Sequence, residues 1–315
     1  MSRIAAVFPG QGSQSVGMLA ELGEQWPEVG QTFEEASGVL GYDLQAVVRG
    51  NPDDRLNQTE CTQPAMLAAD VAVARVWWAA GGPEPALAAG HSLGEYAALV
   101  LAGAIGYADA IRLVAERARL MQNAVPAGEG GMAALLGLED DRVAKICEHL
   151  PTERIVEPVN FNAPGQVVIA GHADAVAQAI EATREAGAKR AVELPVSVPS
   201  HSSLMKDAAA SLAEYMADIE FRAPRMPVVH NVDAAVHADV DGIREALRRQ
   251  LYNPVRWTES VQALREGGAD VFVELGPGKV LTGLARRIDR SMTALAVEDP
   301  ASLEKALDHC RENGA

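Results

Sequence analysis

The segment AGHSLGEY (89–96) contains the pattern Gly-x-Ser-x-Gly, with Ser92 at its centre. This pattern is typical of a nucleophilic serine at a sharp turn between a strand and a helix. A serine hydroxyl reacts at neutral pH only when a base takes its proton and when N–H groups stabilise the oxyanion that forms. Glycine-rich turns match the same pattern by chance, so the rest of the chain must supply the base and the oxyanion site.

The residues around Ser92 favour the reactive interpretation. The apolar run ALAAG (86–90) predicts a strand before the serine, and SLGEYAALVLAGA (92–104) predicts a helix after it. Gly90 and Gly94 carry no side chains that would clash in the tight turn. The helix N-terminus also favours the negative charge that develops beside the serine. We therefore interpret Ser92 as a nucleophile.

Seven histidines are candidates for the base. His91 is adjacent to the serine on a tight turn and would point away from it, and four others lie in predicted surface helices, turns or loops. These four are His149, His172, His237 and His309. His230, in PVVHNV, lies in an apolar run, where a histidine is more often structural than catalytic. His201, in VSVPSHSSLM, follows a predicted strand and opens a helix at a junction between two structural units, where substrate clefts are common.

No acidic residue is evident as a partner for His201. A backbone carbonyl can also accept the Nδ1 proton of a histidine and orient the ring, so an acid is not required. The sequence leaves the identity of that acceptor open.

The segment FPGQGSQ (8–14) follows the first predicted strand. It is not a dinucleotide fingerprint, because Ser15 stands where the third glycine is required. Gln11 lies between two glycines and is suited to offer its backbone N–H to an oxyanion, and Leu93, directly after the nucleophile, would offer a second. The segment ELGPGK (274–279) lacks Walker A spacing, and we interpret it as a strand-to-helix turn.

Helical and strand patterns alternate over most of the chain, which predicts an α/β protein with a mostly parallel sheet. Residues 126–198 differ, because their order is β-α-β-β-α-β, the ferredoxin-like split unit. We expect a large α/β unit at 1–125 plus 199–315, interrupted by this small subdomain. Predicted strands lie at 4–8, 86–90, 132–138, 155–162, 166–171, 188–198, 226–232 and 270–276. Predicted helices lie at 63–80, with Pro64 near the first turn, and at 92–104, 107–124, 139–150, 173–187, 201–219, 241–251 and 255–268.

Composition excludes several classes of protein. The formal net charge is −16 and no basic run is present, so nucleic acid is not expected as a partner. The N-terminal apolar run is too short for a secretory signal, and no stretch is long enough to span a membrane. Cys61, Cys147 and Cys310 lie far apart without a CxxC pair, which argues against disulfides and zinc. We expect a reduced, cytoplasmic setting.

Seven segments together resemble the malonyl-CoA:acyl-carrier-protein transacylase family of bacterial type II fatty-acid synthesis. They are FPGQGSQ, GHSLGEY, RARLMQ, NFNAPGQVVIAG, PSHSSLM, RRQLYNPVRW and ELGPGKVLTGL. The resemblance implies a hydrolase-like α/β core with a ferredoxin-like insert. It also implies transfer of a malonyl group from malonyl-CoA to the pantetheine thiol of acyl carrier protein, through a malonyl-serine and without a metal or bound cofactor.

The resemblance implies a role for each site residue. Ser92 would be the acylated nucleophile, with His201 as its base and the main-chain carbonyl of Gln250 as the acceptor that orients the ring. The backbone N–H groups of Gln11 and Leu93 would form the oxyanion hole.

Arg117, in ERARLMQ, would bind the free carboxylate of the malonyl group, and Asn162 and Gln63 would lie near the site. Arginine suits this role because its planar fork pairs with a carboxylate through two hydrogen bonds. Acetyl-CoA would leave the buried guanidinium unpaired. Without the resemblance, Arg117 fits equally well as a surface charge facing Glu116 or Asp109.

Three alternatives remain. A serine hydrolase or thioesterase would share the Ser92 turn, although it has no use for a buried cation in its acyl pocket. A non-catalytic partner in a synthase complex would not need Ser92, His201 and Gln11 together. An acyltransferase that loads a polyketide carrier protein would share all of these residues.

Carrier proteins are acidic as a class, so docking on this acidic chain requires a local positive patch. One candidate patch contains Lys279, Arg286, Arg287 and Arg290. The other contains Lys189 and Arg190. We expect the chain to be a monomer.

Overall fold

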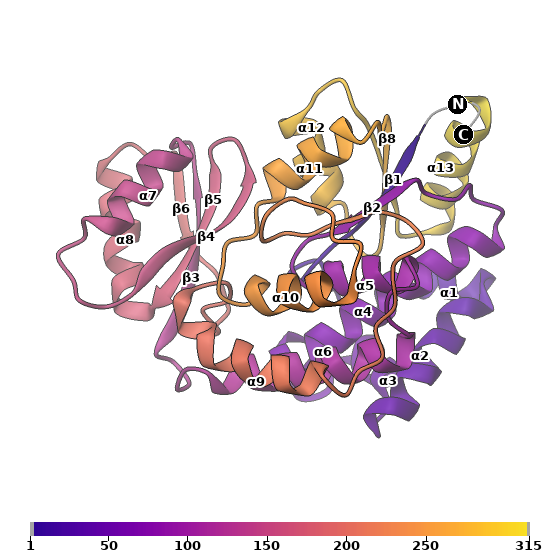
Figure 1. The fold of residues 1–315 in the computed structure, drawn as a ribbon, viewed down its shortest axis with the longest axis horizontal. Helices are drawn as coiled ribbons and strands as arrows, with labels where there is room; N and C mark the ends of the chain where they lie inside the picture. Colours follow the sequence, from indigo (N-terminus) through magenta and orange to yellow (C-terminus); the bar gives the residue numbers. More distant parts are fainter. Residues whose placement is uncertain (1–2, 314–315) are drawn as a thin grey trace.

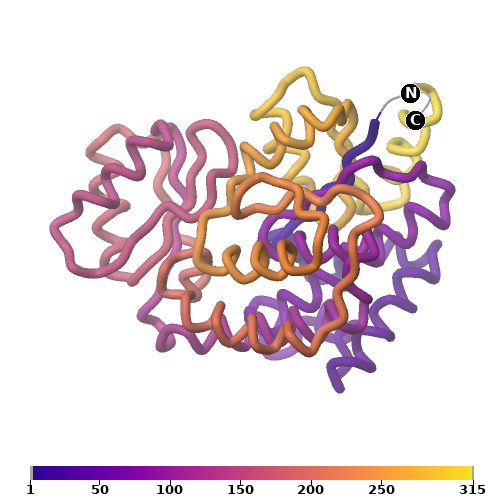
Figure 2. The backbone as a smooth tube through the Cα atoms, viewed as in Figure 1, coloured from indigo at the N-terminus to yellow at the C-terminus, as the bar shows by residue number. Residues whose placement is uncertain are grey.

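A computed structural model describes residues 3–313, which form one five-stranded and one four-stranded sheet with helices packed around them. Figure 1 shows the four-stranded sheet and its two helices at the left, beside the rest of the molecule. The tube in Figure 2 enters this part after the purple segment, is magenta to pink within it, and leaves it where the colour turns to orange. The α/β class with an inserted subdomain is therefore confirmed.

The large sheet is parallel throughout and has the strand order β7-β2-β1-β8-β9. Its strands are β1 (Ile4–Phe8), β2 (Leu87–Gly90), β7 (Val228–Val229), β8 (Val271–Leu275) and β9 (Thr293–Val297). In β1, Ile4, Ala6 and Phe8 pack into one apolar core, whereas Ala5 and Val7 pack into a second core on the opposite face. Because the strands are parallel, the loops that follow β1, β2 and β8 meet at one edge, where ligands bind in open α/β sheets.

Helices cover both faces of the large sheet. They are α1 (Ala20–Gln25), α2 (Pro27–Leu40), α3 (Leu44–Gly50), the 3-10 helix η1 (Pro52–Asn57), α4 (Thr59–Ala79), α5 (Gly94–Leu101), α6 (Tyr107–Asn123), η2 (Ser203–Met205), α9 (Lys206–Met216), α10 (Val240–Gln250), α11 (Trp257–Glu266), α12 (Val280–Ile288) and α13 (Pro300–Glu312). The first core joins the sheet to α2, α4, α5, α6, α9 and α13, and the second joins it to α11 and α12.

The four-stranded sheet is antiparallel, in the order β4-β5-β3-β6. Its elements are β3 (Gly130–Leu136), α7 (Asp140–Glu148), β4 (Val156–Ala163), β5 (Gln166–His172), α8 (Ala173–Glu185) and β6 (Arg190–Glu193). This order in sequence and in space is the ferredoxin-like arrangement that the β-α-β-β-α-β pattern predicts. Both helices pack on one face of the sheet through a core of their own.

Strand β4 joins the subdomain to the large unit. Phe161 N donates to Val255 O and Val255 N donates to Val159 O, each at 2.9 Å, so β4 continues as a two-bond ladder with the segment before α11. Glu157 Oε2 also accepts a hydrogen bond of 2.6 Å from Ser203 N, close to His201. The subdomain is therefore held by backbone pairing and not only by its two linkers.

The structure corrects several expected boundaries. Helix α4 begins at Thr59, so Pro64 lies inside the helix and not in its first turn. Strand β7 contains only Val228–Val229, and β6 ends at Glu193, shortly before Pro195. The helix expected from 201 is regular only from Lys206, after the 3-10 turn η2.

Candidate active site

Ser92 lies in the turn between β2 and α5, with φ of 51°. This left-handed conformation is uncommon for a residue with a side chain and is typical of strained active-site turns. The turn is possible because Gly94 has no side chain: a Cβ atom there would lie 2.1 Å from Phe8 O. The end of β1 therefore packs directly on the turn, and the hydroxyl of Ser92 lies at the N-terminus of α5.

The Ser92 hydroxyl contacts a histidine whose other ring nitrogen binds a carbonyl. Ser92 Oγ lies 2.7 Å from His201 Nε2, and His201 Nδ1 lies 2.7 Å from Gln250 O. A carbonyl can only accept, so Nδ1 carries the proton and Nε2 is free to take the serine proton. Gln250 is the last residue of α10, where carbonyls have no partner within the helix.

The surroundings of His201 favour its neutral form. Burial, together with the nearby charge of Arg117, lowers the pKa of His201 to about 3, although its bond to Gln250 O acts in the opposite direction. Its φ of 65° is a second left-handed conformation in the site. The ring is therefore unprotonated in the unliganded protein at every pH near neutrality.

This lowered pKa predicts the pH dependence of acylation. A base with a pKa near 3 stays unprotonated as pH falls from 8 to 5, so kcat/KM for acylation of the protein should stay flat over this range. The ordinary value of 6.5 would instead produce a decline of more than 10-fold from about pH 7 downward. Stopped-flow acylation at constant ionic strength, with unfolding monitored at each pH, distinguishes the two. An inflection near pH 6.5 would contradict the assignment of His201 as a base that stays neutral.

Arg117, on α6, is 1% exposed and points at the nucleophile. Its Nη2 lies 3.3 Å from Ser92 Oγ and 3.1 Å from Gln250 Oε1, and its Nη1 lies 2.5 Å from Gln63 Oε1. Burial lowers the pKa of the guanidinium, although an arginine remains charged. Within residues 3–313 it forms no ion pair, so its charge has only neutral hydrogen-bond partners.

The alternative interpretation of Arg117 as a surface charge is wrong. Glu116 pairs with Arg119 at 2.6 Å, and Asp109 pairs with Arg112 at 2.6 Å, all of them on the outer face of α6. Arg117 points instead into the protein.

The two expected oxyanion donors lie on loops that meet at the Ser92 turn. A Cβ atom on Gly10 would lie 2.5 Å from His91 O, so the segment that carries Gln11 packs against the turn. Leu93 directly precedes α5 as its N-cap residue. Among the described residues, the backbone N–H groups of Gln11 and Leu93 donate to no other group, which is what an oxyanion site requires.

The remaining predicted residues lie at the edge of the site. Gln63 binds Arg117 and also donates to Met121 Sδ at 3.7 Å. Asn162 Oδ1 lies 2.7 Å from His91 Nε2 and does not contact Ser92. His91 thus points away from the nucleophile, as expected.

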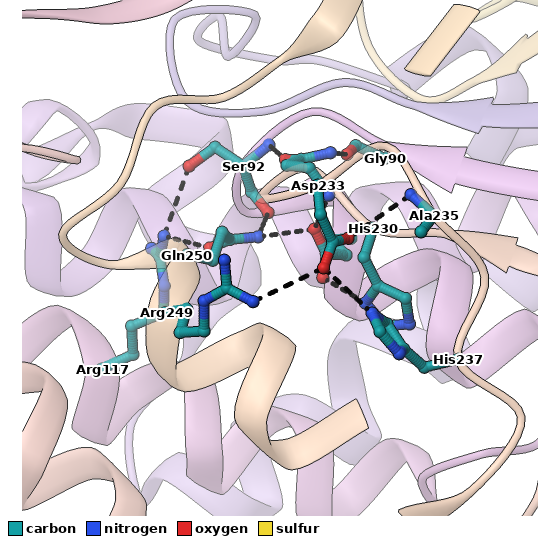
Figure 3. Close-up of polar contacts among 11 residues, drawn as sticks. Gly90, Ser92, Arg117, His230, Asp233, Ala235, His237, Arg249 and Gln250 are labelled. Carbon is teal, nitrogen blue, oxygen red and sulfur yellow. Dashed lines mark hydrogen bonds and ion pairs between the residues drawn. The ribbon is translucent and has the colours of Figure 1, made fainter. Parts of the chain in front are cut away.

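Sequence analysis missed a set of buried polar residues behind the nucleophile. Asn231 Oδ1 accepts a hydrogen bond of 2.7 Å from Ser92 N, and Asn231 Nδ2 donates to Gly90 O at 2.7 Å. Figure 3 shows these contacts beside those of Gln250 and His230. A carboxylate in the apolar helix after the serine, Glu95, was the available signal, but its partners lie about 135 residues further along the chain.

The described residues hold no group of three or more His, Cys, Asp or Glu side chains that could bind a metal. Within residues 3–313, moreover, no helix is both long and apolar enough to cross a membrane. The site therefore consists of a serine, a neutral histidine, two backbone donors and one buried cation. This arrangement can form an acyl-serine from a thioester whose acyl group carries a negative charge.

Comparison with known proteins gives the same result. Residues 6–303 match the acyl transferase domain family. The malonyl CoA-acyl carrier protein transacylase of Salmonella typhimurium is 57% identical over 98% of this chain and 99% of its own. An acyl carrier protein S-malonyltransferase from Vibrio cholerae, also 57% identical, superimposes with a TM-score of 0.93 over 96% of this chain and 99% of its own.

A second solved structure contains a holo acyl carrier protein of a type II polyketide synthase in complex with its malonyl-transacylase. That transacylase is 55% identical to this chain, with a TM-score of 0.96 over 98% of this chain and 100% of its own. Similarity of this extent along the whole length of both chains leaves no room for a different family. The chain therefore belongs to the malonyl-CoA–acyl carrier protein transacylase family.

Proposed function

We propose that this acyltransferase moves the malonyl group from malonyl-CoA to the pantetheine thiol of acyl carrier protein, through a malonyl ester on Ser92. The product supplies extender units for fatty-acid synthesis. The observation that carries the proposal is the position of Arg117, a buried cation with only neutral partners, 3.3 Å from Ser92 Oγ. The carboxylate of a malonyl group lies two carbons from the carbonyl that Ser92 attacks, so a malonyl ester at Ser92 brings it within reach of the guanidinium.

In the first half-reaction, Ser92 Oγ attacks the thioester carbonyl while His201 Nε2 takes the hydroxyl proton. The negative charge moves to the carbonyl oxygen, where the N–H groups of Gln11 and Leu93 would stabilise it. The carbon–sulfur bond then breaks, and His201 gives its proton to the departing CoA thiolate.

The second half-reaction reverses these steps with a different thiol. The pantetheine thiol of the carrier loses its proton to His201 and attacks the malonyl ester, and Ser92 regains the proton as its C–O bond breaks. The negative end of α10 and the carbonyl of Gln250 stabilise His201 while it is protonated. The reaction is ping-pong, since one product leaves before the second substrate binds.

The intact mass of the purified protein tests this proposal. Malonyl-CoA should add one malonyl group, acetyl-CoA should add far less, and holo acyl carrier protein should then remove the adduct and gain its mass. Steady release of malonate without a thiol acceptor would identify a hydrolase instead. If the protein forms no adduct and shows no turnover, the acyl-serine mechanism is ruled out.

The polyketide carrier remains a second candidate acceptor, because a transacylase 55% identical to this chain is seen bound to one. The two acceptors differ only in the carrier protein, so competition between a fatty-acid carrier and a polyketide carrier for the same malonyl-enzyme decides between them. The carrier with the larger kcat/KM is the physiological class.

For the carrier, we propose a docking site on α12. Its exposed face carries Val280 and Gly283 together with Arg286 and Arg287. Arg287 also donates to Gln166 Oε1, so the patch adjoins the junction with the subdomain. Lys279, in contrast, pairs with Glu298 at 2.7 Å and is partly neutralised.

Charge reversal tests this docking site. Arg286→Glu with Arg287→Glu should raise the KM for the carrier several-fold and weaken its salt dependence, with acylation by malonyl-CoA unchanged. Lys189→Glu with Arg190→Glu on β6 is the matched comparison. If neither pair changes the KM for the carrier, both patches are excluded as docking sites.

The three cysteines bear on the redox environment in which the protein works. Cys61, Cys147 and Cys310 are all buried and unpaired. We infer a reducing, cytoplasmic environment, in which free cysteines are usual.

A further inference from the structure

Glu95 is a fully buried carboxylate three residues after the nucleophile, and the mechanism above does not use it. It accepts three hydrogen bonds. Its Oε1 lies 2.7 Å from His230 Nδ1, and its Oε2 lies 2.9 Å from Asn231 N and 2.9 Å from Gln250 Nε2. A buried carboxylate must be paired in this way, because an unpaired one costs several kcal/mol.

The donors to Glu95 come from two segments that are distant in sequence. His230 and Asn231 follow β7, whereas Gln250 ends α10. Figure 3 shows His230 and Gln250 on the same side of Ser92. His230 must carry its proton on Nδ1 to donate to the carboxylate, and its Nε2 has no hydrogen-bond partner in the described chain.

Glu95 determines which way the Gln250 side-chain amide points. The two hydrogens of Gln250 Nε2 are both used, one by Ser92 O at 2.9 Å and one by Glu95 Oε2. Its Oε1 must therefore face the opposite side, where it accepts from Arg117 Nη2 at 3.1 Å. With the amide reversed, an NH₂ group would face the guanidinium and repel it.

The position of Arg117 thus depends on this amide. Its other hydrogen-bond partners are Gln63 Oε1 and Ser92 Oγ, both neutral, and its Cζ lies 5.5 Å from the centroid of the neutral Tyr96 ring. The negative charge of Glu95 acts on the guanidinium, and the single amide of Gln250 bonds to both groups. We infer that Glu95, supported by His230, is a positioning residue that sets acyl specificity, because it fixes the Gln250 amide and through it the carboxylate-binding geometry of Arg117.

The substitution Glu95→Gln separates charge from shape. An amide at position 95 has one oxygen for the three donors that now share two. Its NH₂ group then faces either His230 or Gln250, and in the second case the Gln250 amide reverses. In the first case a neutral His230 can move its proton to Nε2 and accept from the NH₂ group, so Gln250 stays in place. In the second case the buried Asn231 N–H loses its acceptor and Arg117 is displaced. Both cases remove the negative charge that the Gln250 amide faces.

The inference rests on the proposed binding of the malonyl carboxylate by Arg117. The kinetics must therefore be measured with both acyl donors, malonyl-CoA and acetyl-CoA. In Glu95→Gln the ratio of kcat/KM for malonyl-CoA to that for acetyl-CoA should fall between about 10- and 100-fold. The fall should come mainly from a higher KM for malonyl-CoA, since the carboxylate contact is made both before and in the transition state. Glu95→Asp, which keeps the charge on a shorter side chain, should restore part of the ratio.

His230→Phe provides a second variant that keeps ring volume and removes the donor to Glu95. It should lower the same ratio by a smaller factor. His237→Phe is the matched control, because the His237 ring packs at a tilt against His230, 5.2 Å between ring centroids, and bonds Asp233 but does not contact Glu95. The ratio should not change in this control.

The outcomes separate the two levels of argument. Suppose that Arg117→Ala lowers the ratio. If Glu95→Gln then leaves the ratio unchanged, including by lowering kcat/KM equally for malonyl-CoA and acetyl-CoA, this inference is wrong and the proposed function stands. If Arg117→Ala also leaves the ratio unchanged, the proposed function fails first. If Glu95→Gln and His230→Phe both fail to fold, the network is a determinant of stability and the positioning role is overturned.

Discussion

Replacement of Ser92 by alanine is expected to abolish the malonyl adduct and to lower the rate of transfer to the carrier on the order of 10⁴-fold or more. Among the described residues, no other hydroxyl is hydrogen-bonded to His201, so the base would have no nucleophile to deprotonate. The oxyanion donors and the cation of Arg117 would remain, and substrate binding should therefore change little. Intact mass after exposure to malonyl-CoA measures the adduct, and a carrier-loading assay measures the rate.

An exposed serine serves as the control for Ser92→Ala. Ser291 is exposed, bonds Asp289 and has no hydrogen bond to a residue of the site, so Ser291→Ala should keep full activity. A malonyl adduct of full stoichiometry on Ser92→Ala would show that another residue carries the acyl group.

The second large effect is expected at Arg117. Arg117→Ala should lower kcat/KM for malonyl-CoA on the order of 10²- to 10³-fold, the effect of leaving one member of a buried charge pair alone. Acetyl-CoA carries no carboxylate, so its kcat/KM should change little or rise. The ratio of the two donors, measured by competition in one reaction, therefore collapses toward one.

Two comparisons sharpen the Arg117 test. Arg117→Lys keeps the charge but loses the planar fork, and should retain part of the preference for malonyl-CoA. Arg119→Ala lies two residues further on α6, removes only an exposed pair with Glu116, and should have no effect on either donor. If Arg117→Ala lowered kcat/KM equally for malonyl-CoA and acetyl-CoA, the arginine would stabilise the site without discriminating between acyl groups.

Much of the fold could be predicted because local pattern and tertiary environment agree. The continuous apolar runs of β1, β2 and β8 are buried on both faces, as strands in a parallel sheet must be. The subdomain was readable for a similar reason, since its strands and helices follow one another without long loops. The elements that pair in it are close in sequence.

Other elements had no comparable signal. Helix α2 contains Gly30 and Gly38, which weaken helical propensity, and it is stabilised by packing of Val29 and Phe33 in the core. Strand β7 is only two residues long because the chain turns away at His230 and Asn231, whose polar groups bind Glu95. Such contacts depend on the tertiary fold and cannot be read from local sequence.

The site also has features that the local sequence predicts and features that depend on the tertiary fold. The Ser92 turn has a local pattern, and the structure brings Ser92, His201, Gln250 and Arg117 together. The role of the Gln250 side chain was not predicted, because it depends on an acceptor on α5, which is 155 positions away. The spacing of residues in the sequence predicts contacts between residues that are close along the chain. A buried hydrogen-bond network forms only when distant segments pack together.

The central position of β1 also determines the order in which the protein can assemble on the ribosome. Ile4 pairs with Val271, so β1 must wait for the much later β8 before the middle of its sheet is complete. The subdomain, whose pairs are local, can fold much earlier. A nascent chain that ends before Gln250 already contains Ser92 and Arg117 but lacks the carbonyl that orients His201. We expect such incomplete chains to be unreactive toward acyl-CoA, so the chemistry begins only after α10 has been synthesised.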